Sequence, residues 1–376
     1  MAIVLTVNAG SSSIRLAAFA VDNPEPRRVA AYHGEHCPSE AHSVLTKVLS
    51  EWRLGDFMAV THRIVHGGEA LTHTCMLDDA VEAEIERLAP LAPLHNPTAL
   101  AWIRACREAL GGEVPQVAIF DTAFYAGLPQ VAATYALPHS LCDKYGLRRY
   151  GFHGLAHEAL WRRWRELSGV IGMKSRVISL QLGAGCSITA IRNGKPVDTS
   201  MGFSPLEGLV MATRCGDVDP GLLLFLQQAE GLRPDALERL LNRESGLLGV
   251  SGLSGDMRTL LEAPSEAARQ AMDLYCYRAR KYIGAYLTVL EGTDAILFGG
   301  GVGENAPAVR ARILAGMEWA GIVLDAGANC AFGTEARISS PNSQVEMWVI
   351  LVDEAQILAR EALAVIVARR LQEGGR

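Results

Sequence analysis

The sequence predicts an α/β protein built from two related domains. Its 376 residues exceed what one hydrophobic core normally supports, because single cores stop growing near ~250–300 residues. Short apolar runs alternate with helical patterns along the chain. A strand–turn–strand pattern at the start of the chain recurs about half a chain later, which indicates an internal duplication.

Both copies of this pattern predict a β-hairpin with a turn of small and hydroxyl residues. In the first copy, the run Ile3–Val7 leads through Asn-Ala-Gly-Ser-Ser-Ser into Ile14–Phe19. In the second copy, Val177–Leu182 leads through Gly183–Ser187 into Ile188–Ile191. The matching segments are Ala-Gly-Ser-Ser-Ser-Ile and Ala-Gly-Cys-Ser-Ile. Because they are short, a chance match is the alternative to duplication.

A third glycine-rich segment follows the predicted strand Ala295–Phe298. We predict a turn over Gly299–Asn305 and a helix that begins within Ala306–Arg310, where a proline suits the first turn. A strand that feeds a glycine turn and a helix presents backbone N–H groups to an anion or a nucleotide. Further helices are predicted over 82–88, 98–110, 267–290 and 353–371.

Composition and charge exclude several classes of function. Lys plus Arg total 35 against 41 for Asp plus Glu, so no broad cationic surface is available for nucleic acid or anionic lipid. The sequence has no basic leader that would predict a signal peptide and no long apolar run that would predict a membrane span. The eight cysteines form no C-x-x-C pair, which favours reduced thiols in a cytoplasmic protein.

The glycine loops match none of the common nucleotide motifs. The sequence has no P-loop, no clean G-x-G-x-x-G and no protein-kinase H-R-D or D-F-G element. Arg63 and Arg214 instead lie in polar, glycine-flanked segments. Two guanidinium groups from separate segments suit a transferring phosphoryl group. For either arginine alone, a local ion pair with Glu69 or Asp217 is the simpler interpretation.

Ten ordered motifs cover nearly the whole chain. They are NAGSSSI, HRIVHGGE, LAPLHNP, FDTAF, YGFHG, DTSMGFSPLEGL, TRCGDVDP, SGLLGVSG, GGGVGEN and DEAQILARE. They resemble those of the acetate kinase family, which contains the acetate and propionate kinases.

The resemblance implies a duplicated ribonuclease H-like, actin-like ATPase fold of the sugar kinase, heat-shock protein and actin superfamily, with a cleft between two domains. It predicts an N-terminal domain of 1–123 plus 355–376, a nucleotide-binding and dimerisation domain of 124–354, and a homodimer.

The resemblance assigns catalytic roles to residues from five of these motifs. Arg63 and Arg214 would bind the carboxylate or acyl phosphate, and His153 would stabilise the transition state. Asp121 matches the residue usually given an acid/base role, but acetate arrives ionised near pH 7. Orienting Arg63 or a metal-bound water is therefore the physically simpler task for Asp121. His95 matches an active-site histidine, with a loop-ordering hydrogen bond as the alternative.

The resemblance also implies the ligand contacts. Asn8 and Glu354 would lie around Mg²⁺, or alternatively Mn²⁺, because ATP phosphates favour a hard ion held by few protein oxygens. The spacing of His153 and His157 would also suit a metal pair, but no third ligand is evident. The acyl methyl group would contact Val65, Leu94, Phe152 and Pro205. ATP or ADP would contact Arg15, Gln181, Leu182, Gly183, Ala184, Gly185, Asp256, Met257, Arg258, Gly301, Val302, Gly303, Glu304 and Asn305.

Three of these positions depart from the family pattern. Arg15 stands where the family carries Lys, and Gln181 and Ala184 replace the His and Asn of a His-Leu-Gly-Asn-Gly segment. Loss of one donor aimed at developing charge costs about 2.7–4 kcal/mol of transition-state stabilisation. A pyrophosphate-dependent variant is therefore conceivable, although the intact segment Gly299–Asn305 favours ATP.

The predicted function is reversible in-line phosphoryl transfer between ATP and acetate, which yields acetyl phosphate and ADP. By resemblance, Val65 favours acetate over propionate, but one methylene group in an apolar pocket is worth only ~1–3 kcal/mol. A propionate or other short-chain fatty acid kinase is the alternative among enzymes. A weakly catalytic nucleotide-binding scaffold is the alternative of a different class, supported only by Gln181 and Ala184.

Overall fold

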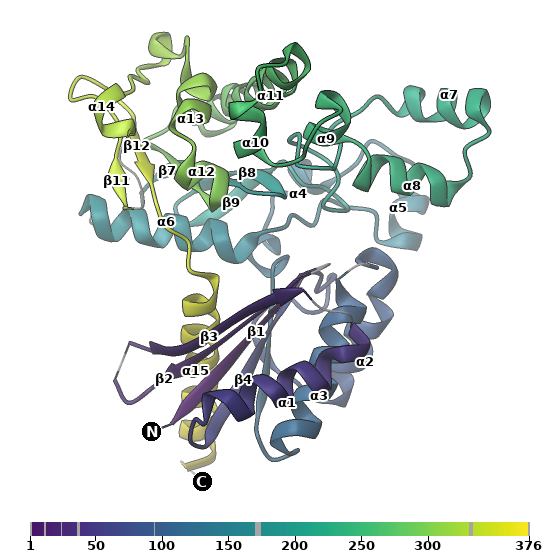
Figure 1. Cartoon of the computed structure of the whole chain (residues 1–376), viewed down its shortest axis with the longest axis vertical. Helices are drawn as coiled ribbons and strands as arrows, with labels where there is room; N and C mark the ends of the chain where they lie inside the picture. The colour runs from purple at the N-terminus through teal and green to yellow at the C-terminus, as the bar shows by residue number, and fades with distance from the viewer. Residues whose placement is uncertain are drawn as a thin grey trace. The chain divides into compact units, whose positions relative to one another are not determined.

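The computed structural model describes residues 2–10, 13–23, 25–35, 38–93, 95–169, 174–330 and 334–374. The chain divides into two compact units, Met1–Ala126 with Asp353–Arg376, and Gly127–Val352 (Figure 1). Glu354 therefore belongs to the first unit, whereas the sequence analysis ended the second domain at this residue.

The first unit is built on a six-stranded sheet with the order β3-β2-β1-β4-β6-β5. β1 pairs antiparallel with β2 and parallel with β4, and β4 pairs parallel with β6. The carboxyl ends of β1, β4 and β6 therefore lie at one edge of the sheet. The strands are β1 (Ile3–Ala9), β2 (Ser13–Ala20), β3 (Arg27–Glu35), β4 (Phe57–Ile64), β5 (Cys75–Met76) and β6 (Gln116–Phe120).

Helices cover both faces of this sheet. α1 and α3 lie on one face and α15 on the other (Figure 1). All seven residues of β1 are buried, as expected for a strand with both faces covered. The helices are α1 (Ala41–Trp52), α2 (Asp79–Arg87), α3 (Asn96–Leu110) and α15 (Glu354–Gly374), with 3₁₀ turns at Pro38–Glu40, Ala89–Leu91 and Ala123–Tyr125.

The second unit repeats the topology of the first. Its sheet has the order β11-β12-β10-β7-β8-β9, and β7 pairs antiparallel with β8 and parallel with β10. β7, β8, β9, β10 and β12 thus correspond to β1, β2, β3, β4 and β6, which confirms the predicted duplicated α/β fold. The strands are β7 (Arg176–Leu182), β8 (Cys186–Arg192), β9 (Lys195–Thr199), β10 (Ala295–Gly299), β11 (Ala336–Arg337) and β12 (Glu346–Val349).

Helices α6 and α11 pack on opposite faces of this second sheet. Ser187 of β8 bonds to α6, whereas its neighbour Cys186 bonds to Tyr275 of α11, and successive strand residues face opposite sides. The helices are α4 (Gln130–Ala133), α5 (His139–Tyr145), α6 (Gly154–Ser168), α7 (Pro220–Glu230), α8 (Pro234–Arg243), α9 (Gly246–Ser251), α10 (Met257–Glu262), α11 (Glu266–Leu290), α12 (Gly300–Asn305), α13 (Pro307–Leu314) and α14 (Ala326–Asn329), with a 3₁₀ turn at Glu318–Ala320.

The predicted turn over Gly299–Asn305 is wrong, because Gly300–Asn305 forms the short helix α12. Gly300 adopts φ 77°, and a Cβ atom there would lie 2.6 Å from the carbonyl oxygen of Leu182. Glycine therefore allows the chain to turn directly from β10 into a helix that packs against β7. None of the helices described is both long and apolar enough to cross a membrane.

Candidate functional site

Four polar side chains meet at the carboxyl ends of the parallel strands in the first unit. Asn8 lies at the end of β1, Arg63 near the end of β4, and Asp121 directly after β6. The backbone N–H of Asp121 donates to the carbonyl of Ile64 at 2.9 Å and extends the ladder. Glu354 begins α15. Strand register and helix start together explain how residues so distant in sequence come into contact.

Arg63 is the centre of this cluster. Its Nε and Nη2 atoms donate to Asp121 Oδ1 and Oδ2 at 3.0 and 2.6 Å, in the bidentate geometry of a guanidinium and a carboxylate. Its Nη1 donates to Asn8 Oδ1 at 3.1 Å and lies 3.5 Å from Glu354 Oε2. Asn8 Nδ2 donates to the same Glu354 oxygen at 2.6 Å. The arginine thus pairs with Asp121, not with the sequence neighbour Glu69.

The electrostatics of the cluster keep Arg63 charged and fixed. Burial acts to lower the pKa of Arg63, but the charges of Asp121 and Glu354 outweigh it and raise this pKa above its ordinary value. The Asp121 side chain is 1% exposed and that of Arg63 14%. One cation and two carboxylates share the site, so it bears a negative charge while all three are ionised.

Other predicted residues of the first unit lie on or next to three different elements, β2, β4 and α3. Arg15 of β2 is paired in register with Asn8 and is exposed. Directly paired residues of antiparallel strands share a face, so Arg15 and Asn8 lie on one side of the sheet. Val65 is buried directly after β4, and His95 is the residue before α3. The predicted acyl contact Leu94 lies outside the described residues.

In the second unit, Arg214 and His153 both lie next to Gly185. A Cβ atom at this glycine would lie 2.8 Å from Arg214 Nη2 and 3.4 Å from His153 Nε2. The glycine belongs to the turn between β7 and β8, where the N–H of Gly183 donates to its carbonyl at 3.1 Å. A side chain at this position would push the guanidinium away, which is a steric reason for glycine in the loop.

Arg214 differs from Arg63 in having no carboxylate partner among the described residues. Its Nη1 donates to the carbonyl of Pro205 at 2.5 Å. Burial lowers the pKa of Arg214 below its ordinary value. The predicted alternative, an ion pair with Asp217, is not formed, because Asp217 lies 3.3 Å from Arg278 and accepts from Tyr282 at 2.9 Å. This cation is therefore available to an anionic ligand.

The predicted histidine pair is not arranged around a metal position. His153 Nδ1 and His157 Nε2 lie 2.8 and 2.7 Å from the same hydroxyl, that of Ser187. Within the described part of the chain, no group of three or more His, Cys, Asp or Glu residues is placed to hold a metal ion. His153 adopts φ 57° directly before α6, which turns its side chain out of the helix.

The remaining loop residues occupy different environments. Phe152 and Leu182 are buried, and Ala184 is exposed with its carbonyl bonded to the N–H of Ala212 at 3.0 Å. Gln181 is partly buried, and its Oε1 atom has no hydrogen-bond partner among the described residues. This acceptor is free at the position where the family pattern has an imidazole.

Glu304 lies near the end of α12, but its carboxyl group reaches back to the start of the helix and changes what this end can bind. Its Oε1 atom accepts from the N–H groups of Gly300 at 3.0 Å and Val352 at 3.3 Å. Burial raises the pKa of Glu304, and these two hydrogen bonds oppose that shift. The first N–H of α12 is therefore already used by a carboxyl group, which makes this end a poor phosphate site. Gly301 and Asn305 remain exposed along the helix.

Arg310 follows α12 in the sequence and supports its carboxyl end, and no sequence pattern singled it out. It has 0% exposure, and its Nη1 donates to the carbonyls of Gly303 and Glu304 at 2.7 and 3.0 Å. Its Nε and Nη2 donate to Asn329 Oδ1 and O at 2.8 and 2.6 Å. The guanidinium therefore holds the carboxyl end of α12 against α14. The sequence offered one indication, an arginine one turn after a glycine-rich segment. Arginines at such positions are common in surface helices, so this indication did not single out Arg310.

The predicted ATP or ADP contacts at the start of α10 are partly open to solvent. Asp256 caps this helix by accepting from the N–H of Arg258 at 2.9 Å, and the two side chains form an ion pair at 2.8 Å. The Arg258 side chain is 88% exposed, so a planar ligand could stack on it. Met257 is buried, and its side chain belongs to the core.

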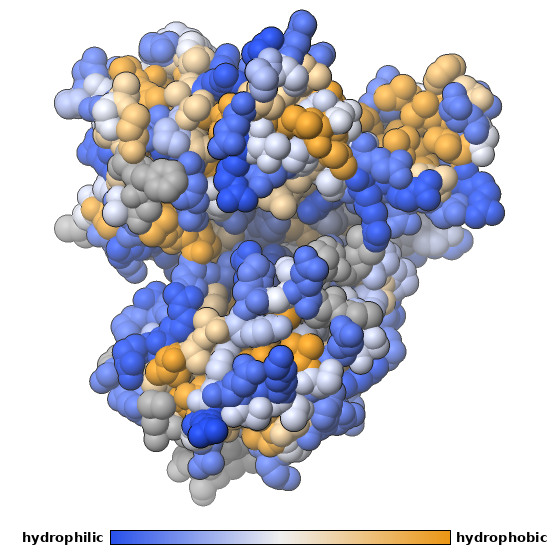
Figure 2. Space-filling model, in the orientation of Figure 1, coloured by the Kyte–Doolittle hydropathy of each residue, from blue (hydrophilic) through white to orange (hydrophobic). Residues whose placement is uncertain are grey.

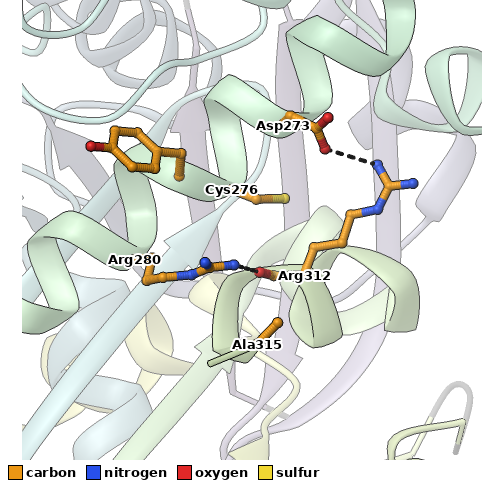
Figure 3. Close-up of a pocket in the computed structure, with 6 residues that line it drawn as sticks. Asp273, Cys276, Arg280, Arg312 and Ala315 are labelled. Carbon is orange, nitrogen blue, oxygen red and sulfur yellow. Dashed lines mark hydrogen bonds and ion pairs between the residues drawn. The ribbon is translucent and has the colours of Figure 1, made fainter. Parts of the chain in front are cut away.

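A cavity of about 420 Å³ lies apart from these loops, between α11 and α13 (Figure 3). Arg280 donates from Nε to the carbonyl of Ile313 at 3.0 Å and from Nη2 to the carbonyl of Arg312. Arg312 lies 3.6 Å from Asp273. Both guanidinium groups have protein partners, and none of the predicted site residues lines the cavity. It is therefore not the candidate site.

Asn8 and Glu354 fit a magnesium ion in the chemistry of their donors. They supply an amide and a carboxylate already in contact at 2.6 Å. Mg²⁺ typically binds one or two carboxylates and completes its octahedral shell with water and phosphate oxygens. The donor set is therefore sufficient for an ion that arrives with a nucleotide, although Arg63 contacts the same two side chains.

Matches to known proteins extend over both units of the chain. The model of the Acetokinase family matches residues 34–360. The acetate kinase of Solibacter usitatus is 48% identical, over 84% of this chain and 77% of its own. The acetate kinase of Thermosipho africanus is 42% identical, over 97% of this chain and 98% of its own.

Solved structures of two activities resemble this chain about equally. The acetate kinase of Porphyromonas gingivalis has a TM-score of 0.88 and 38% identity, covering 97% of this chain and 100% of its own. A propionate kinase from Francisella tularensis has a TM-score of 0.87 and 32% identity, covering 96% and 99%. Backbone similarity therefore does not separate the two acyl substrates.

Replacing the buried arginine of α13 tests its structural role. We expect Arg310→Met to destabilise the second unit by about 2–4 kcal/mol, because the buried acceptors of Gly303 and Asn329 would lose their donors. Arg312→Met on the same helix removes a half-exposed arginine and is expected to change stability by less than about 1 kcal/mol. Urea unfolding followed by far-UV circular dichroism measures both. Equal midpoints for the two variants would refute the role.

Proposed function

Because the chain belongs to the acetokinase family, we propose that it is an acetate kinase, which reversibly transfers the γ-phosphoryl group of ATP to acetate. The observation that carries this proposal is a guanidinium fixed beside the hairpin turn of each unit. Arg63 contacts Asn8 at the end of β1, and Arg214 lies against Gly185 in the turn after β7. Phosphoryl transfer is mostly positioning and charge neutralisation, which two arginines supply.

In the proposed reaction, the acetate oxygen attacks the γ-phosphorus in line, and the bond to the ADP oxygen breaks. Arg63 binds the acyl carboxylate, and Arg214 and His153 donate hydrogen bonds to the transferring group. Asp121 orients Arg63 through two hydrogen bonds and is not needed as a base, since acetate is ionised near pH 7. The opposite direction starts from acetyl phosphate and ADP.

We propose Mg²⁺ as the metal, with Mn²⁺ as an alternative, held through Asn8 and Glu354. The ion would neutralise part of the phosphate charge when it is bound with the nucleotide. The phosphate side of the nucleotide would contact Arg15 and the loop from Gln181 to Gly185. The adenosine side would contact Asp256, Met257 and Arg258 and the segment Gly301–Asn305, which is consistent with a carboxyl group already capping α12.

The acyl group would rest against Val65, Phe152 and Pro205, and Leu94 is retained from the sequence analysis. His95 is proposed as a further contact of the acyl phosphate. Val65 and Phe152 are buried apolar residues, which suits a methyl group. A propionate kinase is the second candidate, and the similarity to a propionate kinase structure at a TM-score of 0.87 favours keeping it.

We also propose that the protein is a cytoplasmic homodimer. None of the residues of α7 is buried, and Leu222, Leu224 and Phe225 are 47, 60 and 61% exposed. Figure 2 shows apolar side chains gathered in the region of α7. Exposed apolar patches of this kind mark protein interfaces. The seven described cysteines are free thiols, which suits a reducing compartment.

A coupled assay tests the proposed function directly. Acetate, propionate and butyrate are offered at matched concentrations, first with ATP and then with pyrophosphate. We expect transfer from ATP, with acetate preferred over propionate by ~10–200-fold in kcat/KM, the range for one methylene group. Transfer only from pyrophosphate would overturn the nucleotide donor. No transfer with any combination would leave the nucleotide-binding scaffold as the remaining interpretation.

Asp121→Asn tests whether this carboxylate orients Arg63 or transfers a proton. We expect turnover that is ~10–100-fold lower but measurable, because misorientation of a substrate-binding group has effects of this size. The acidic limb of the pH profile should stay unchanged, since arginine remains charged throughout. Arg63→Lys keeps the charge without the bidentate contact, and the double variant should lose little more than either single variant. Loss of the acidic limb would restore the acid/base role.

Ala184→Asn restores an amide donor to the exposed tip of the second hairpin turn. We expect kcat with ATP to rise by ~10-fold or more, because a donor near developing phosphate charge stabilises the transition state. The mutation faces solvent in the free protein, so the unfolding midpoint should not change. Ala184→Leu, which adds a similar volume without a donor, is the matched control. An equal effect of both variants would contradict the donor explanation.

A further inference from the structure

A chain of four side chains links the core of the second unit to His153. His153 Nδ1 lies 2.8 Å from the hydroxyl of Ser187, which also lies 2.7 Å from His157 Nε2. The other nitrogen of His157, Nδ1, lies 2.9 Å from the hydroxyl of Ser179. Ser179, Ser187 and His157 have 0% exposure, so bulk water does not compete for these hydrogen bonds.

Regular secondary structure positions three of these four residues, and the fourth, His153, is the residue directly before α6. His157 lies in the first turns of α6, whereas His153 adopts φ 57° at its N-cap, so the hydroxyl between them and not the helix period relates the two rings. Ser179 and Gln181 share one face of β7, and Gln181 is paired with Ser187 of β8. α6 covers this face, so the strand register places Ser179 and Ser187 beside His157, and Ser187 also reaches His153.

The hydrogen bonds of the chain must all point in one direction. Burial, and then the charge of His153, lowers the pKa of His157 well below its ordinary value, so this ring is neutral. A neutral imidazole has one N–H donor and one acceptor, and a serine hydroxyl has one hydrogen. Ser187 can therefore donate to only one of the two rings, and in a continuous chain it accepts from the other. The hydrogens point either toward His153 or toward Ser179.

We propose that Ser187 and His157 are positioning residues that keep the hydrogen of the neutral form of the His153 ring on Nε2, an inference that rests on the proposed function. This nitrogen lies on the side of the phosphate loop, 3.4 Å from a Cβ atom at Gly185. Ionised phosphoryl oxygens only accept hydrogen bonds, so they select the direction in which Nε2 donates. Ser187 then donates to His153 Nδ1 and accepts from His157 Nε2, and Ser179 donates to His157 Nδ1.

The same chain fixes the orientation of the ring. A flipped His153 would direct a carbon atom at the Ser187 hydroxyl and leave that buried group without this partner. Holding an imidazole in the correct tautomer contributes up to ~10⁴ in kcat when a carboxylate does it, as in serine proteases. A neutral serine acts more weakly, so an effect of ~10–100-fold is expected here.

The test combines a spectroscopic readout with kinetics on the full-length protein. Long-range ¹H–¹⁵N correlation of the imidazoles should show His153 with a protonated Nε2 in the wild type and a mixture of tautomers in Ser187→Ala. The kcat of Ser187→Ala should fall ~10–100-fold, with KM within ~2-fold. Ser179→Ala, one step further away, should have a smaller effect. His157→Gln retains an N–H donor in the position of Nε2 and should recover most of the activity that His157→Phe loses.

An unchanged tautomer and an unchanged kcat in Ser187→Ala would overturn the proposal. Equal losses in His157→Gln and His157→Phe, both folded by circular dichroism, would also overturn it, because that pattern indicates packing alone. The spectroscopic readout does not need turnover. A tautomer shift in a wild-type protein without kinase activity would therefore support the hydrogen-bond chain and reject the proposed function.

Discussion

The ion pair of Arg63 and Asp121 is the interaction on which the strand ends of the first unit depend. Two hydrogen bonds join the groups at 3.0 and 2.6 Å, and they tie β4 to the residue after β6. The contact of Asn8 with Arg63 joins β1 to this ion pair, and the contact of Glu354 with Arg63 joins the start of α15 to it. A cation with a 14% exposed side chain is stable here only because these partners compensate for lost hydration. The same contacts therefore balance the charge of Arg63 and fix the relative positions of the strand ends.

The sequence predicted the fold where local pattern and tertiary contacts agree. The hairpin strands at Ile3–Val7 and Val177–Leu182 are apolar runs ended by small residues, and each lies within a strand of the structure. Gly299–Asn305 was misassigned because five of its seven residues are glycine or asparagine, which favour turns. Glu304 and Arg310 stabilise the two ends of α12 through contacts that no local pattern reveals.

Residues of the candidate site could be chosen from the sequence, but their pairing could not. Asn8 and Glu354 are 346 positions apart, so only the folded sheet and α15 bring them to 2.6 Å. Spacing drew attention to His153 and His157 as a pair, but the hydroxyl between them comes from β8. Arg310 was not predicted because its structural role depends on its complete burial, which is a property of the fold.

The two units place arginines at corresponding hairpins in opposite electrostatic settings. Arg63 is compensated by two carboxylates, which raise its pKa, whereas burial lowers the pKa of Arg214, which has no acidic partner among the described residues. An incoming anion adds little to a cation that is already neutralised, but it compensates one that is not. On the proposed function, Arg63 therefore serves mainly to orient the acyl group. The interaction of Arg214 with the transferring group strengthens most as negative charge develops there. Such an interaction stabilises the transition state more than the ground state.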